Sequence, residues 1–450
     1  MHRPDFSTGK ISTTMIKISL PIMLAELVSL LYSIVDRIFI GHMEGVGALA
    51  LTGLGLCFPV IQLVNAFSRL FGSNGGAPLS AIERGRENEE EANKILGASF
   101  MMSLITGAIL VVITFIALKP MLYLFGASDA TYPYACDYLS IYNIGTIPVI
   151  ITLTLNSFIN SLGQTGAGMV TILIGAVLNI ILDPLFIFKF GLGIKGAAIA
   201  TVISQSASAL FTLLFLTRKG LGLKLSIKYI SLQKERCFKI MTLGLSGYTM
   251  GATNSLVQIV CSRTALYWGG DLFVGVMAVM NSVREIFTTP INGLTSAAGP
   301  MMSYNYGARN GKRVRETSNY LLKITLIVSA IIWAIVFTFT TVFASLFTSD
   351  AQMIEASKSA LKIYFFGFVF MAFQSTGQQT FVALGKAKQA IFFSLLRKLF
   401  IVVPLTLLLP FFFGSNGILL AEPISNALGG LAAYFTMRHI VMPELKDLER

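Results

Sequence analysis

Charged residues are scarce in this sequence. Asp, Glu, Lys and Arg make up 12% of its 450 residues, whereas a soluble globular chain carries about 25%. Hydrophobic residues make up 54%, and the mean hydropathy is +0.73. The shortage of charge excludes an ordinary soluble domain. It indicates an all-α polytopic membrane protein whose surroundings are the lipid bilayer.

The residues of common catalytic and metal centres are also few. The sequence has four cysteines, mostly inside apolar runs, and three histidines, which lie near the ends of predicted helices. Neither set has the spacing of a disulfide framework or a metal site. The sequence contains no Gly-x4-Gly-Lys-Ser/Thr loop, which excludes ATP hydrolysis by such a loop. We therefore expect no enzyme activity and no cofactor, with an ion gradient as the source of energy.

Twelve apolar runs of about 20 residues can each cross a bilayer as a helix; the seventh is Ile240–Tyr267. An even number places both termini on one side. Lys and Arg concentrate in the loops on the side of the N-terminus, so the positive-inside rule places both termini in the cytoplasm. This distribution accounts for the net charge of +12 without a nucleic-acid partner.

The two halves of the chain resemble each other. Asn156–Gln164 (NSFINSLGQ) aligns with Gln378–Lys386 (QQTFVALGK) at an offset of 222 residues, since 385 − 163 = 222. Gly196–Ser204 aligns with Gly417–Ser425 at an offset of 221, since 417 − 196 = 221. With six spans in each half, this is a parallel repeat about an axis along the membrane normal.

The repeat predicts the domain organisation. We expect an N-lobe over residues 1–217 and a C-lobe over residues 240–450, each with six helices. The two lobes should be related by a pseudo-two-fold axis along the membrane normal. Residues 218–239 between them are basic and amphipathic, which predicts a cytoplasmic linker at the membrane surface.

Two polar residues interrupt the fifth apolar run. Asn179 and Asp183 are four residues apart, so they share one face of a helix. Pro184 follows directly, lacks an N–H group, and should bend the helix there. An ionisable side chain inside a membrane costs roughly 2.5–3.5 kcal/mol and is by default a functional candidate.

Further acids lie in other spans. In the first span Tyr32 and Asp36 share a helix face, while Glu26 either lines a cavity or pairs with another helix. In the twelfth span Glu422 aligns with Thr201 of the other half. Acids deep in the spans, with few deep bases, favour cationic substrates. A scaffold or receptor would gain nothing from the cost of inserting them.

Several stretches resemble one transporter family. They are VDRIFIGH (Val35–His42), NSFINSLGQT (Asn156–Thr165), LNIILDPLFIFKFGLGIKGAAIATVIS (Leu178–Ser204) and GPMMSYNYGARN (Gly299–Asn310). Together they are similar to the MATE (multidrug and toxic compound extrusion) family, in its prokaryotic DinF/MepA-like branch. The resemblance covers essentially the whole chain. It implies two six-helix lobes around a central cleft and a monomer in the plasma membrane.

The resemblance also implies site residues. By it, H⁺ or Na⁺ would bind at Asp36, Asn179, Asp183 and Thr201. The expected substrate cavity comprises Tyr32, Tyr138, Asn156, Gln374, Gln378, Glu422 and Glu26. The implied function is secondary active efflux of cationic drugs or dyes by alternating access, in exchange for H⁺ or Na⁺. The alternative is a flippase for lipid-linked precursors or glycolipids within the same superfamily.

Overall fold

The structure is a computed structural model that describes residues 6–125, 127–218, 220–346 and 351–447. These residues form helices and turns, with no strand among them. They divide into two compact units. One is Leu20–Gly244, and the other joins the segment that ends at Ser19 to the chain from Leu245 onward. The predicted all-helical class is confirmed.

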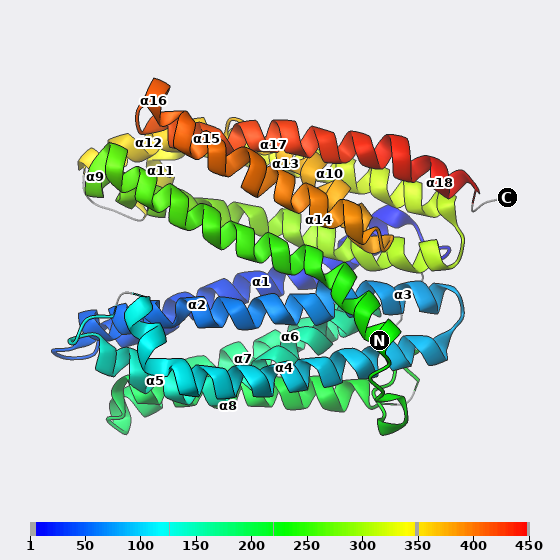
Figure 1. Cartoon of the computed structure of the whole chain (residues 1–450), viewed down its shortest axis with the longest axis horizontal. Helices are drawn as coiled ribbons and strands as arrows, with labels where there is room; N and C mark the ends of the chain where they lie inside the picture. The colour runs from blue at the N-terminus through cyan, green and yellow to red at the C-terminus, as the bar shows by residue number, and fades with distance from the viewer. Residues whose placement is uncertain (1–5, 126, 219, 347–350, 448–450) are drawn as a thin grey trace. The chain divides into compact units, whose positions relative to one another are not determined.

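The first unit contains most of α1 and the helices that follow it (Figure 1). Their bounds are α1 (Ile11–Gly41), α2 (Gly47–Phe71), the π-helical turn η1 (Gly72–Gly76), α3 (Ala77–Gly85), α4 (Glu89–Leu124), α5 (Tyr132–Ile144), α6 (Thr146–Ser161), α7 (Thr165–Pro184), the π-helical turn η2 (Leu185–Lys189), α8 (Gly193–Leu216) and the 3₁₀ turn η3 (Ile227–Tyr229). Helices α7 and α8 pack closely. Ser208 Oγ of α8 donates a 2.9 Å hydrogen bond to the carbonyl of Thr171 in α7. A Cβ at Gly175 would lie 2.8 Å from that hydroxyl, so a small residue is needed at this crossing.

The second unit begins inside α9 (Lys234–Gly307). Helix α9 consists of two helices that meet at Gly270, whose φ of +62° favours glycine. The remaining bounds are α10 (Gly311–Thr338), α11 (Thr340–Ser345), α12 (Ala351–Phe365), η4 (Phe368–Phe370), α13 (Met371–Ala383), α14 (Ala387–Leu395), η5 (Leu396–Val402), α15 (Val403–Leu408), α16 (Pro410–Phe413), α17 (Asn416–Thr436), η6 (Met437–Val441) and α18 (Met442–Asp447). In Figure 1, α14, α15 and α16 follow one another as one interrupted span.

The described helices account for the twelve expected spans. Nine are long and apolar enough to cross a membrane, and two bent helix pairs bring the number to 11. The expected span Ile240–Tyr267 forms the first half of α9 but is not among them. Its many Gly, Ser and Thr residues lower its mean hydropathy. Composition alone therefore identifies one span fewer than the helical architecture contains.

The repeat is visible in the helix breaks. The pair α5 and α6 bends by 54°, and the pair α12 and α13 bends by 40°. Gly145 lies in the first break, where a Cβ would be 2.9 Å from the Val202 side chain. Gly367 lies in the second, where a Cβ would be 2.7 Å from Pro423 Cα. Since 367 − 145 = 222 and 423 − 202 = 221, equivalent positions make equivalent close approaches.

Each unit has its own apolar core. In the first, Leu139, Ile187 and Ala197 belong to one fully buried cluster. In the second, Leu361 and Phe365 belong to another. Large apolar side chains are also exposed along many helices of both units. Exposed aliphatic and aromatic side chains are compatible with lipid as the surrounding solvent.

The chain after α8 packs against the first unit. The backbone N–H of Lys224 donates a 2.7 Å hydrogen bond to Asn93 Oδ1 at the start of α4. Arg236 donates two hydrogen bonds to Glu91, of 2.7 and 2.9 Å. Further on, a Cβ at Gly244 would lie 1.9 Å from the Leu70 carbonyl oxygen. The linker and the first turns of α9 are therefore anchored to α4 and α2.

Arg236→Met should destabilise this anchor. Arg236 is 7% exposed and Glu91 32% exposed, so the pair is partly protected from solvent. Losing a charge-assisted bidentate pair should cost about 1–3 kcal/mol. A lower midpoint of thermal unfolding in detergent checks this. Lys234→Met, at an exposed linker position, is the control, and equal midpoints for both variants would contradict the expectation.

The segment before α1 packs against the second unit. Asn305 Nδ2 donates a 2.9 Å hydrogen bond to the carbonyl of Phe6. Arg313 donates to the carbonyls of Phe6 and Gly9. Helix α1 therefore starts in the second unit and continues into the first.

Candidate cation-coupling site

Three predicted site residues meet between α7 and α8. Asn179 Nδ2 donates a 3.1 Å hydrogen bond to Asp183 Oδ1 and lies 3.4 Å from Thr201 Oγ1. The Thr201 hydroxyl donates to the carbonyl of Ala197 at 3.0 Å. Asn179 is 3% exposed and Asp183 is fully buried. A carboxyl, an amide and a hydroxyl thus form one connected polar group in an apolar helix pair.

The local sequence explains this arrangement. Helix α7 ends at Pro184 and continues into the π-helical turn η2. The following turn contains Gly191 and Gly193, whose φ angles of +66° and +55° favour glycine. A Cβ at Gly196 would lie 2.6 Å from the backbone of Phe186. Glycine there allows α8 to approach η2 closely, which brings Thr201 next to the polar face of α7.

Helix α1 adds a second carboxyl group. The carboxyl group of Asp36 lies close enough to that of Asp183 to interact with it. Within the described part of the chain, Asp36 Oδ1 and Asp183 Oδ2 are buried and accept no hydrogen bond. A buried polar atom without a partner costs free energy, so one such oxygen on each of two neighbouring carboxyl groups needs an explanation. A shared proton or a bound cation would satisfy both.

Two tyrosines complete the surroundings. Tyr138 of α5 is 3% exposed and within hydrogen-bond reach of Thr201. Tyr32 lies one helical turn before Asp36 and is within electrostatic range of Asp36 and Asp183. The structure therefore brings together residues from α1, α5, α7 and α8.

The atoms at this site that could bind a cation are all oxygens. It comprises the carboxylates of Asp36 and Asp183, the Thr201 hydroxyl and the amide oxygen of Asn179. Hard cations such as Na⁺ prefer oxygen ligands, and a carboxylate pair can equally hold a proton. Among the described residues no group of three or more His, Cys, Asp or Glu side chains could hold a metal ion.

Two other predicted residues lie away from this site. Glu26 is ten residues before Asp36, about 15 Å along α1, and lies within electrostatic range of Arg69 on α2. Asn156 Oδ1 faces Gly168, fifteen residues before Asp183 and thus about 22 Å along α7. Asn156 is therefore not a neighbour of the coupling site.

The predicted cavity residues of the second unit are engaged within that unit. Gln378 Nε2 donates to the carbonyl of Ala390 at 3.1 Å and to Ser394 Oγ at 3.2 Å, which ties α13 to α14. Gln374 packs against α17, where a Cβ at Gly430 would lie 3.2 Å from its Cβ. The amide of Gln378 thus acts between helices in this structure.

Glu422 is paired with cations. Arg397 Nη1 and Lys398 Nζ both donate to it, at 3.1 and 2.9 Å. The expectation of few bases deep in the spans is therefore wrong for the second unit, since Lys398 is 3% exposed. Sequence reasoning missed both residues, although they lie inside the eleventh apolar run, Ala390–Phe413. Two adjacent basic residues inside an apolar run, several residues from either end, indicate charged side chains buried within the membrane span.

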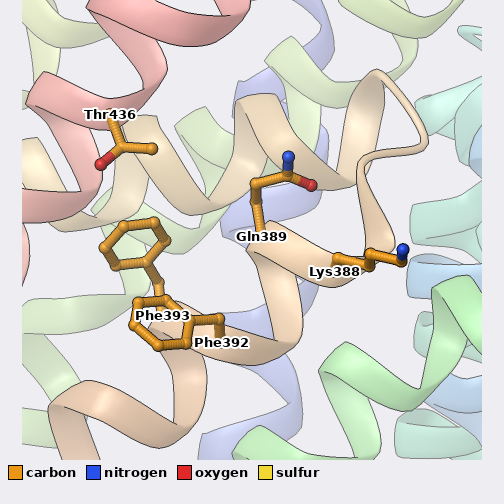
Figure 2. A pocket seen from close by; sticks show the side chains of 5 residues that line it. All are labelled: Lys388, Gln389, Phe392, Phe393 and Thr436. Carbon is orange, nitrogen blue, oxygen red and sulfur yellow. The ribbon is translucent and has the colours of Figure 1, made fainter.

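The described residues also line two hollows in the second unit. One, of about 310 Å³, is lined by Lys388, Gln389, Phe392, Phe393 and Thr436 (Figure 2). In Figure 2 the Lys388 side chain points away from the two phenylalanine rings. The other, of about 380 Å³, is lined by Lys312, Arg315, Glu316, Asn319, Arg438, Met442 and Pro443. Neither hollow contains a predicted site residue.

Comparison with known proteins identifies the family. The MatE family model matches residues 21–185 and 249–408, once in each half. The chain is 26% identical to "Multidrug export protein MepA" of Staphylococcus haemolyticus, over 96% of this chain and 94% of that protein. It is 24% identical to the protein of that name in Staphylococcus aureus, over 95% and 94%.

Solved structures show the same fold. A "multidrug resistance MATE family transporter of the MOP superfamily" in an outward-facing conformation is 22% identical, with a TM-score of 0.91 over 99% of both chains. A MOP superfamily transporter from Pyrococcus furiosus is also 22% identical, with a TM-score of 0.91 over 100% of this chain and 99% of that one. The two matches to the MatE model and this fold lead to one conclusion: the chain belongs to the MatE family, as a multi-pass membrane transporter rather than an enzyme.

Proposed function

We propose that this chain is a secondary active multidrug efflux antiporter that exports bulky organic cations in exchange for H⁺ or Na⁺. The observation that carries the proposal is the pair of buried, unpartnered carboxyl oxygens on Asp36 and Asp183. The relatives named multidrug export proteins support the substrate class. The chain would act as a monomer in a prokaryotic plasma membrane, with both termini in the cytoplasm.

Coupling would proceed through the charge of the carboxyl pair. Two carboxylates side by side in a medium of low polarity disfavour joint ionisation, so loading a proton or Na⁺ relieves their repulsion. Loading also removes negative charge that holds a cationic drug. The ion and the drug therefore favour different states of the first unit, and each lowers the affinity for the other by the same factor. Asn179 donates to Asp183 and also lies 3.4 Å from Thr201, so it would keep Asp183 oriented toward the site.

A flippase for lipid-linked precursors is the second candidate. The observation that favours it is the pair of buried bases Arg397 and Lys398, because anionic lipid head groups need cationic partners. The Pyrococcus furiosus neighbour is described as having a binding pocket of reversed polarity that suggests a different function. The unpartnered carboxyl oxygens beside Asn179 favour the antiporter, because they suit a cation.

Ethidium accumulation in a pump-deficient bacterial host tests the proposal. Cells that express the chain should accumulate less ethidium than cells with an empty vector. A protonophore, or removal of external Na⁺, should restore accumulation, because export stops when the driving gradient collapses. Export that survives loss of both gradients, or resistance to anionic compounds alone, would contradict the proposal.

A further inference from the structure

The second unit holds a charged group that the coupling site does not use. Glu422 of α17 accepts a hydrogen bond from Arg397 at 3.1 Å and two from Lys398 at 2.9 and 3.1 Å. Arg397 also donates to Asn426 Oδ1 at 2.9 Å. The side chains of Arg397 and Glu422 are each 12% exposed, so one edge of the group is accessible. Arg284, Arg397, Lys398 and Glu422 are called the C-lobe cluster.

Positive charge is in excess in the C-lobe cluster. Arg284, from the second half of α9, lies within electrostatic range of Glu422 and Lys398. Its Nε atom is buried and makes no hydrogen bond to any described residue. Arg284 is also within electrostatic range of Glu285 and within hydrogen-bond reach of Tyr364, so three cations share two carboxylates. Burying each ion costs several kcal/mol, and two carboxylates cannot compensate three cations. An unbalanced charged group inside a membrane is a functional candidate.

The backbone fixes the positions of the donors. Arg397 and Lys398 lie on η5, a π-helical segment between α14 and α15. Such segments are rare and often occur at functional sites. Ser425 Oγ donates a 2.8 Å hydrogen bond to the Arg397 carbonyl, which ties η5 to α17. A Cβ at Gly429 would lie 3.1 Å from Arg397 Cγ, so glycine gives this side chain room.

The internal repeat allows the charges around equivalent positions of the two units to be compared. Glu422 stands where the first unit has Thr201, at an offset of 221 residues. Around Thr201 the first unit gathers Asp36 and Asp183, whose free oxygens are acceptors. Around Glu422 the second unit gathers cationic donors. Equivalent places in the repeat therefore suit charges of opposite sign.

We propose that the C-lobe cluster binds a carboxylate carried by an amphiphilic small-molecule substrate. The inference rests on the proposed efflux function and names the part of the second unit that would recognise the anionic group of a zwitterionic substrate. A guanidinium matches a carboxylate with two parallel hydrogen bonds, and Arg284 has an unused buried N–H for it. Glu422 is the resident anion of the C-lobe cluster and competes with a substrate carboxylate for the same donors.

A matched pair of dyes tests the site. Rhodamine 123 is the methyl ester of rhodamine 110, so the two differ in one carboxylate. Each dye is titrated against the purified full chain in nanodiscs of phosphatidylcholine, where no anionic lipid competes. Binding is followed by fluorescence polarisation, and folding is checked by gel filtration. Lys362→Met, at an exposed position of α12, is the control for the loss of one lysine.

The two key variants should have opposite effects. Lys398→Met should raise the dissociation constant for rhodamine 110 about tenfold, the size expected from losing one charge-assisted hydrogen bond. Glu422→Gln should lower it by a similar factor, because the competing carboxylate is gone. Rhodamine 123 should be affected less than about twofold by either variant. Lys398→Arg, which retains the charge, should restore rhodamine 110 binding.

Other outcomes decide against the proposal. If folded Lys398→Met and Glu422→Gln bind rhodamine 110 like the unmodified chain, or if both dyes shift in parallel, the C-lobe cluster is not a carboxylate site. Failure of the unmodified chain to bind rhodamine 110 would also overturn it. If Lys398→Met does not fold, Arg284→Gln takes its place. Rhodamine 110 binding without export of rhodamine 123 from cells would instead reject the efflux function and leave the carboxylate site standing.

Discussion

Asp183→Asn should abolish ion-driven export of ethidium and leave the protein folded in the membrane. The amide is the same size as the carboxyl and can still accept the hydrogen bond from Asn179, which is 3.1 Å away. It cannot carry the charge that a proton or Na⁺ neutralises. Removing the titrating or ligating group of a coupled transporter removes the link between gradient and drug, so the loss should be complete rather than partial. Asp36→Asn should behave in the same way.

The measurement is ethidium efflux from energised vesicles, scaled to the amount of each variant in the membrane. Asp137→Asn is the matched control, because Asp137 lies in the same unit and makes only an exposed ion pair with Lys195 at 3.4 Å. Such a pair contributes about 0–1 kcal/mol, so the control should export normally. Export by Asp183→Asn at the unmodified rate would move the coupling site elsewhere.

Gly196→Leu should prevent assembly of the same site by another route. A Cβ at Gly196 would lie 2.6 Å from the backbone of Phe186, closer than atoms can approach. Helix α8 must move away from η2 to admit any side chain, and overpacking of this kind costs about 1–3 kcal/mol for each misfit. The separation would move Thr201 away from Asn179. We expect less folded protein in the membrane and no gradient-driven export from what remains.

Gly166→Leu provides the control for this substitution. Gly166 lies on α7, the partner helix of α8, and a Cβ there would meet no atom within 4 Å. Leucine is a better helix former than glycine, so this variant should be at least as stable as the unmodified chain. The comparison uses membrane expression, the midpoint of thermal unfolding and ethidium efflux. Equal values for the two variants would mean that α8 does not need glycine at the crossing.

Much of this architecture could be predicted from sequence, because it follows from local chemistry. The spacing of Asn179 and Asp183 fixes their common helix face, and the structure joins them with a 3.1 Å hydrogen bond. The length and apolarity of the runs predict the helices, and the offset of 221–222 residues predicts that the two halves repeat. The helix breaks at Gly145 and Gly367, which were not predicted, lie at the same offset. These features depend on residues close in sequence or on internal similarity.

Features that depend on contacts between distant residues were harder to predict. Whether Glu422 is free or paired depends on how η5 packs against α17, and apolar runs do not reveal that. The π-helical turns depend on tertiary packing as well. Asn156 lies on the expected helix but faces Gly168, far along α7 from the coupling site. Whether Asn156 lies near the coupling site therefore depends on its position along the helix axis, which its residue type does not reveal.

The central claim is that a drug cation and the coupling ion compete through Asp36 and Asp183. Ion release on drug binding tests it most directly, because linkage requires each ligand to expel the other. Tetraphenylphosphonium is added to purified protein in weak buffer, while a pH indicator reports protons and radioactive sodium reports Na⁺. The unmodified chain should release one of the two ions as the drug binds, and Asp183→Asn should bind the drug and release neither. Drug binding to the unmodified chain without release of either ion, or equal release from Asp183→Asn, would contradict the account.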